Sequence, residues 1–144
     1  MYRDFNRKGR TMQNLKTQKG VLIGSGLIAI AVGWGLLFSP EAFHALNGIE
    51  LGDSASLMSE IRAPGAGLLA SGLLIFSGVF VSRLSFTALV VAMLLYLSYG
   101  ISRFYSMALD GLPADGIIFV AFLEMAIGLA CAFTLQRHLR THSY

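Results

Sequence analysis

A small set of polar residues interrupts a sequence that is otherwise strongly apolar. Arg103 and Glu124 stand inside long apolar segments. An ionised side chain in hydrocarbon costs at least about 2.5–3.5 kcal/mol, so it normally faces a partner or a wet cavity. Two such residues of opposite sign at a similar depth indicate one shared polar site. The candidates for that site are Glu60, Arg62, Tyr99, Arg103, Asp110 and Glu124.

These residue types support two kinds of site. In a ligand pocket, the two arginines bind an anion, a lipid head group or a quinone carbonyl, and Glu124 carries a proton. In a structural lock, Arg103 pairs with Glu124, and Arg62 pairs with a carboxylate or with carbonyls at a helix end. Buried ion pairs add little net stability but can specify one arrangement of helices. Both interpretations stay open, and both can hold together.

Helical spacing decides which candidates can converge. Tyr96, Tyr99 and Arg103 follow at i, i+3 and i+7 and therefore share one helix face, which Asp110 continues. Glu60 and Arg62 are two positions apart, and residues at that spacing do not point the same way. At most one of them is expected to face the centre of a bundle.

Several chemistries lack the residues they need. The three histidines, His44, His138 and His142, all lie outside the apolar segments, which excludes intramembrane ligation of haem by two histidines. Cys131 is the only cysteine, so the chain has neither an intramolecular disulfide nor a CxxC motif. We expect no metal, no cofactor and no set of catalytic residues.

The elements that must position the polar residues are membrane spans. The chain has 144 residues, of which 55% are hydrophobic and 13% charged, against roughly 25% charged in soluble domains. The sequence contains four apolar runs of roughly 18–24 residues, which is long enough to cross a hydrocarbon core of about 30 Å. Such runs cross it only as helices, because lipid offers no partners for unpaired backbone groups. We predict an all-α, single-domain bundle of four transmembrane helices at residues 21–38, 58–81, 86–109 and 116–135.

Charge in the flanking segments predicts the orientation. Acidic residues without Lys or Arg occupy the connections after the first and third apolar runs, whereas Lys and Arg gather elsewhere. The positive-inside rule then places both termini in the cytoplasm of a bacterial inner membrane. We divide the chain into a basic leader (1–20), the transmembrane domain (21–136) and a basic tail (137–144). The basic flanking residues are Arg3, Arg7, Lys8, Arg10, Lys16, Lys19, Arg83, Arg137 and Arg140.

The basic leader admits two interpretations. It is either a helix that lies on anionic lipid or docks a partner, or a solvated tail that only sets the topology. Because it adjoins the membrane and lacks a fold of its own, we expect lipid and not nucleic acid as its partner.

Two short sequences resemble one another. Residues 45–49 read Ala-Leu-Asn-Gly-Ile and residues 108–112 read Ala-Leu-Asp-Gly-Leu. Asn-Gly and Asp-Gly are turn sequences, because both residues tolerate positive φ. The pair indicates either a duplicated helical hairpin or two independent helix caps.

Small residues at spacing four predict how the helices pack. Such stripes let helix backbones approach closely in lipid, within the bundle or in a homodimer. We also expect Pro64 in the first turn of the second helix, where its missing N–H costs least. The stripes are Ser25, Ala29 and Gly33; Ala63, Gly67 and Ser71; and Gly128 with Ala132, which extend the face of Glu124.

The sequence Ser-Glu-Ile-Arg-Ala-Pro-Gly-Ala-Gly at residues 59–67 resembles the "NExRa-x-x-G" signature of the bacterial domain-of-unknown-function 4345 family. Arg103, the Asp-Gly-Leu-Pro sequence at 110–113 and Glu124 follow in the order of that family's "R … dG-x-P … E" pattern. The resemblance covers about residues 21–135. It implies a small four-helix inner-membrane protein, somewhat like the DoxX-type bundles, with the same Glu and Arg residues in its site. It implies no reaction.

Short connections leave little room for an active site in water, so we expect a protein that is not an enzyme. The favoured functions are an accessory subunit of a larger membrane complex or homo-oligomer, and a binding module for lipid or another small molecule. One alternative is a proton- or anion-coupled carrier that works through Arg103 and Glu124. Another is a membrane enzyme on a lipid or quinone, with Glu60 or Glu124 as acid and base.

Overall fold

The computed structural model describes the backbone of residues 2–142 and the side chains of residues 15–140. The described chain is helical apart from its connections. The elements, in order, are α1 (Tyr2–Phe38), α2 (Pro40–Ala45), α3 (Ala55–Ser77), the single 3₁₀ turn η1 (Ser82–Leu84), α4 (Ser85–Asp110) and α5 (Asp115–His142).

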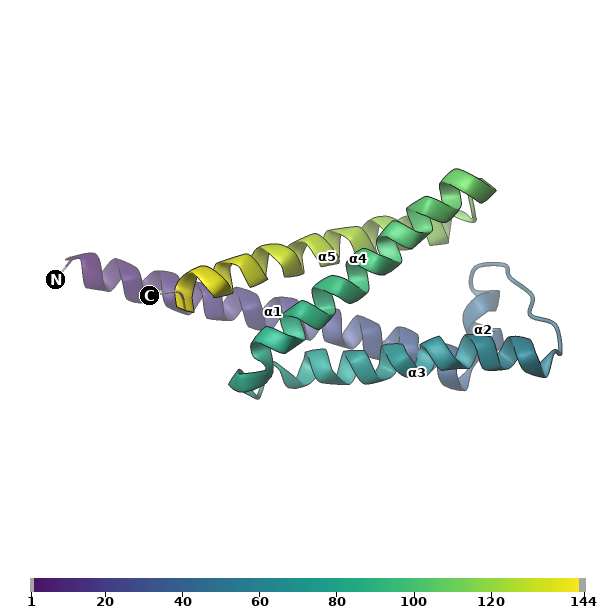
Figure 1. Cartoon of the computed structure of the whole chain (residues 1–144), viewed down its shortest axis with the longest axis horizontal. Coiled ribbons are helices and arrows are strands. Elements are labelled where there is room, and N and C mark those ends of the chain that lie inside the picture. Colours follow the sequence, from purple (N-terminus) through teal and green to yellow (C-terminus); the bar gives the residue numbers. More distant parts are fainter. Residues whose placement is uncertain (1, 143–144) are drawn as a thin grey trace.

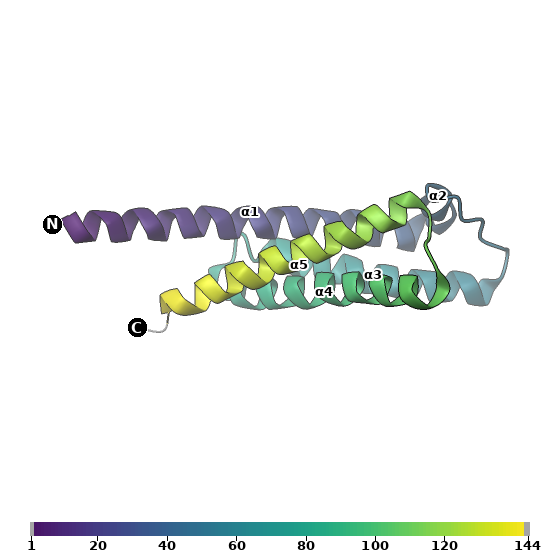
Figure 2. The same ribbon diagram turned by 90° about the horizontal axis from the view of Figure 1, so that it is seen from above.

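The long helices form two hairpins (Figure 1). The most extensive contacts are those of α1 with α3 and of α4 with α5, and fewer contacts join the two hairpins. Both ends of the described chain lie at one end of the molecule, here called the terminal end (Figures 1 and 2). The opposite end carries α2 and the connections at residues 46–54 and 111–114, and is here called the α2 end.

In the described part of the chain, three helical segments are long and apolar enough to cross a membrane: Leu15–Phe38, Ser82–Asp110 and Asp115–Arg140. The segment α3 is not among them, although its 23 residues are sufficient in length, because its first half carries Glu60, Arg62 and Pro64. Large apolar side chains cover the outside of the bundle, including Trp34 at 58% exposure and Phe119 at 67%. An outer surface of this kind suits a hydrocarbon solvent.

The leader and the tail are continuous with the first and last helices. The helix α1 runs through residue 20 without interruption, and α5 extends beyond residue 136 as far as His142. The leader's side chains before residue 15, on which the choice between lipid contact and solvation depends, lie outside the described side chains, as do those of residues 141–144.

Glycines bring α1 and α3 close together. A β-carbon at Gly72 would stand 2.7 Å from the backbone nitrogen of Ile30, and one at Gly65 would stand 2.9 Å from that of Leu37. A β-carbon at Gly33 would stand closer still to the backbone of Leu69. Such close approach lets packing forces hold helices together where lipid gives no hydrophobic drive.

As packing faces within the bundle, the stripe on α1 is confirmed and the stripe on α3 is wrong. Ser25, Ala29 and Gly33 are all buried. On α3 the buried face is Gly65, Leu68, Gly72 and Ile75, whereas nothing lies within 4 Å of a β-carbon placed on Gly67. Small residues occur on α3 in two registers, and the buried one alternates steps of three and four, as a period of 3.6 requires. That register also buries Leu68 and Ile75.

The α4–α5 hairpin packs where the sequence indicated. A β-carbon on Gly128 would stand 2.7 Å from Cδ2 of Leu97, so this position of the predicted stripe does face a neighbouring helix. The fully buried side chains Leu22, Ile75, Leu89 and Cys131 come one from each long helix. They form a core toward the terminal end that joins the two hairpins.

Pro64 lies inside α3 and not in its first turn. The helix begins earlier than predicted, at Ala55, because the hydroxyl of Ser54 caps it by accepting a hydrogen bond from the backbone N–H of Leu57 at 3.4 Å. Pro64 has no N–H to donate to the carbonyl four residues earlier, which belongs to Glu60. The proline therefore removes one helical hydrogen bond beside a predicted site residue.

The two similar turn sequences do contain the predicted turns. Gly48 has φ +70° and Gly111 has φ +93°, both in the left-handed region where a β-carbon is strained. Gly111 directly follows α4, whereas the short helix α2 separates Gly48 from α1. Both turns lie at the α2 end, as equivalent positions in two hairpins would, and a duplication stays a prediction.

Candidate functional site

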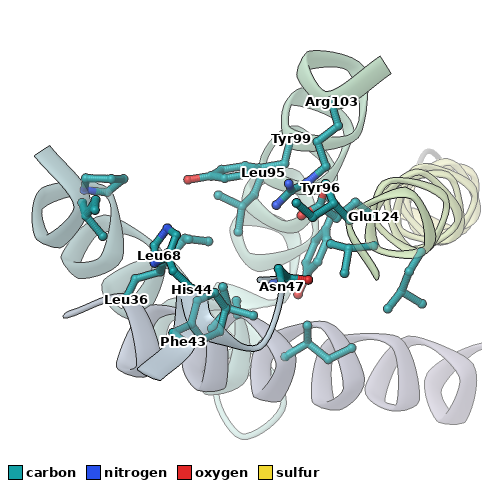
Figure 3. Close-up of a pocket in the computed structure, with 18 of the residues that line it drawn as sticks. Leu36, Phe43, His44, Asn47, Leu68, Leu95, Tyr96, Tyr99, Arg103 and Glu124 are labelled. Carbon is teal, nitrogen blue, oxygen red and sulfur yellow. Dashed lines mark hydrogen bonds and ion pairs between the residues drawn. The ribbon is translucent and has the colours of Figure 1, made fainter. Parts of the chain in front are cut away.

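A cavity of about 450 Å³ lies between the two hairpins toward the α2 end (Figure 3). Its walls come from α1, α3, α4 and α5, and the segment from Phe43 to Ile49 contributes as well. Most of the wall is apolar, as Leu36, Leu68 and Leu95 illustrate. An apolar cavity of this size with a few polar groups is typical of small-molecule binding sites.

An ion pair across α4 and α5 forms the polar part of the wall. The Nε of Arg103 donates a hydrogen bond to Oε2 of Glu124 at 2.8 Å. The Glu124 side chain is 13% exposed and that of Arg103 is 32% exposed. Glu124 is therefore sheltered between helices, while the guanidinium of Arg103 remains accessible.

The ion pair leaves donors available. A guanidinium has five N–H groups, and only the one on Nε is bonded to Glu124. Among the side chains that the structure describes, no other group accepts a hydrogen bond from Arg103. The Tyr99 side chain extends over the cavity from one turn earlier in α4 (Figure 3). The site therefore presents several donors to a bound acceptor.

Four of the six predicted residues come together. Glu60, Tyr99, Arg103 and Glu124 all line the cavity. Glu60 comes from α3, so the cavity wall draws candidate residues from both hairpins. The carboxylate of Glu60 makes no hydrogen bond or ion pair with any side chain in the described part of the chain.

The other two predicted residues lie outside the cavity wall. Arg62 and Glu60 are both exposed on α3, but only Glu60 lines the cavity, in keeping with their two-residue offset. Asp110 is the last residue of α4 and accepts a hydrogen bond from the hydroxyl of Ser106 at 3.0 Å. It follows Arg103 by seven positions on the same face, but it lies beyond the cavity.

His44 is a wall residue that the sequence did not indicate. Its Nδ1 lies 2.8 Å from the carbonyl of Pro40, which can only accept, so Nδ1 carries the proton. In the neutral ring, Nε2 is then an acceptor. Ser39-Pro40 signals only that a short helix begins there, because proline is favoured at a first helical position; it does not signal that α2 lies against the cavity.

Asn47 and Tyr96 complete the polar wall. Asn47 belongs to the first turn sequence, and a β-carbon on Gly116 at the start of α5 would stand 2.9 Å from its Oδ1. The Tyr96 hydroxyl is used inside the fold, because it donates to the backbone carbonyl of Ser25. Its neighbour Tyr99 is thus the tyrosine available to a ligand.

The cavity has a definite charge. Its formally charged wall residues, with His44 counted as neutral, are Glu60, Arg103 and Glu124, which sum to one negative charge. Since Arg103 and Glu124 are paired, the uncompensated charge is that of Glu60. Within the described residues, no three His, Cys, Asp or Glu side chains are arranged to hold a metal ion.

Comparison with known proteins identifies the family and nothing more specific. A model of the family described as "Domain of unknown function (DUF4345)" matches residues 17–135. No curated protein and no solved structure matches this chain significantly. The family match covers most of the chain and includes Glu60, Arg103 and Glu124. This chain therefore belongs to the DUF4345 family.

Proposed function

We propose that this protein is a membrane binding module that holds a small amphipathic molecule in the cavity at the α2 end. The observation that carries this proposal is the position of the Arg103–Glu124 pair on the wall of an apolar cavity. A pair that served only as a lock would be sealed between helices. Here Glu124 fixes Arg103, and the remaining guanidinium N–H groups face a space that can hold a ligand.

The proposed topology is a four-span bundle in a bacterial inner membrane with both termini in the cytoplasm. The three apolar segments support three spans, and α3 is held against α1 by glycines along much of its length. A helix so tightly paired with a span has to accompany it through the bilayer. Residues 1–20 and 137–144 are then the cytoplasmic leader and tail, and the cavity lies toward the outer surface.

A second role, assembly with another membrane protein or a second copy, is supported by one observation. Ala63 and Gly67 on α3 are exposed, and nothing lies within 4 Å of a β-carbon on Gly67. A small-residue face that is not used inside the bundle suits another helix. Replacing Gly67 with leucine would then weaken a detergent-stable oligomer or complex, and an unchanged assembly would contradict this role.

Binding is tested by thermal unfolding of delipidated protein in detergent, with and without a bacterial polar lipid extract. A ligand that binds only the folded state raises the Tm. We expect lipid to raise the Tm of the native protein and not that of the double variant Arg103→Gln, Glu124→Gln, which keeps a neutral pair. Arg62→Gln is the matched control, because Arg62 lies outside the cavity. Equal shifts in all three proteins would contradict the proposal.

A further inference from the structure

The cavity wall carries a cation that is already paired, Arg103, and an anion, Glu60, that has no partner in the described part of the chain. Arg103 on α4 is held through Nε by Glu124 and keeps both Nη groups available. Glu60 on α3 lines the cavity with an exposed side chain and has no hydrogen-bonding or ionic partner among the described side chains. The cavity therefore offers donors on one hairpin and a lone carboxylate on the other.

The net charge discriminates between head groups. The positive charge of Arg103 is already balanced by Glu124, and Glu60 leaves the wall with one negative charge. A head group that is only anionic would gain the Nη donors but would also meet the carboxylate of Glu60. A head group that carries both a phosphate and an ammonium can interact with both hairpins. Its phosphate accepts hydrogen bonds from Arg103, and its ammonium is attracted to the carboxylate of Glu60.

We propose that the ligand is a zwitterionic phospholipid with a phosphoethanolamine head group. This inference rests on the proposed function and specifies its ligand. The phosphate oxygens accept hydrogen bonds from Nη of Arg103 and from the Tyr99 hydroxyl, which lie on one face of α4 (Figure 3). The ammonium group donates to the carboxylate of Glu60.

The rest of the cavity suits the lipid's hydrocarbon. Apolar side chains such as Leu68 and Leu95 make up most of the wall beside the polar residues. Ile28 and Leu123 belong to the wall and are still 37% and 36% exposed, so the apolar lining reaches the surface that faces lipid. A volume of about 450 Å³ holds a head group and the first methylenes, and the two acyl chains continue into the bilayer.

The test is a competition assay in detergent micelles with acyl-labelled phosphatidylethanolamine as the probe. Unlabelled phosphatidylethanolamine, phosphatidylglycerol and oleate are the competitors. We expect phosphatidylethanolamine to compete about tenfold or more better than phosphatidylglycerol, since hydrogen bonds to charged groups have that magnitude. In Glu60→Gln this preference should disappear. In Glu41→Gln, a matched change at an exposed residue of α2 outside the cavity wall, it should remain.

The outcomes separate this inference from the proposed function. If phosphatidylglycerol or oleate competes as well as phosphatidylethanolamine in the native protein, the inference of a zwitterionic head group is wrong. The proposal that the cavity binds an amphipathic molecule is not contradicted by that result. The same holds if Glu60→Gln leaves the preference unchanged. If the probe binds equally to the native protein and to the Arg103→Gln, Glu124→Gln variant, the proposed function fails as well.

Discussion

The Tyr96 hydroxyl on α4 donates a hydrogen bond to the backbone carbonyl of Ser25 on α1, with an oxygen–oxygen distance of 2.5 Å. Both residues are buried, and they belong to different hairpins. This bond ties the hairpins together next to the cavity, in whose wall Tyr96 also lies. Along the bundle, it lies between the core toward the terminal end and the cavity toward the α2 end.

Removing this hydroxyl should loosen the contact between the hairpins. Tyr96→Phe is expected to lower the free energy of unfolding by about 0.5–1.5 kcal/mol, because a buried donor is lost while the ring remains. Thermal or denaturant unfolding in detergent measures the change. Tyr105→Phe is the control, since Tyr105 is 67% exposed on the same helix. Equal stability of the two variants would show that the bond does not join the hairpins.

Glycine positions on α3 should differ sharply in their tolerance of alanine. Gly72→Ala would place a β-carbon 2.7 Å from a backbone nitrogen of α1, and overpacking of this kind costs about 1–3 kcal/mol. Gly67→Ala meets open space and should be neutral or slightly stabilising. The melting temperatures of the two variants, measured side by side, check this. A reversed order would mean that α3 packs through its other face.

The Arg103–Glu124 pair should show energetic coupling. Each single change to glutamine leaves one unpaired charge, whereas the double change leaves two neutral amides. Because the Arg103 side chain is 32% exposed, we expect single losses of about 1–3 kcal/mol, smaller than for a fully buried pair. A double-mutant cycle of unfolding free energies measures the coupling. If the unfolding free energies lost in the two single variants add up to the loss in the double variant, the 2.8 Å contact does not stabilise the packing of α4 against α5.

The proposed topology can be tested by cysteine labelling. Cys131 is buried and is the only cysteine, so replacing it with alanine gives a clean background. Single cysteines at positions 50 and 140 fall at opposite ends of the bundle. An impermeant thiol reagent added to intact cells should label position 50 and reach position 140 only after the cells are opened. Labelling of position 140 in intact cells would reverse the orientation.

The sequence was sufficient for the helical fold and for the pairing of residues across it. Charged residues inside apolar runs are rare and usually have a partner, so the sequence predicted that Arg103 and Glu124 could pair. In the structure their side chains form an ion pair at 2.8 Å. The three-residue step from Tyr99 back to Tyr96 also placed both on the cavity face. Family membership followed from the order of the same residues.

Other features could not be read from a single sequence. Small residues on α3 fit two registers, and only contact with α1 decides that Gly72 is buried and Gly67 exposed. The start of α3 depended on the cap at Ser54, which precedes the apolar run. His44 joins the cavity because α2 folds back after Pro40, and sequence patterns do not encode such tertiary placement.

Native mass spectrometry of the protein purified in mild detergent tests the central claim most directly. We expect the native chain and Arg62→Gln to retain a phospholipid with the mass of phosphatidylethanolamine. The variant Arg103→Gln, Glu124→Gln should lose it while remaining folded. If all three proteins retained the same lipids, or the native chain retained none, the cavity would not be a phospholipid-binding site.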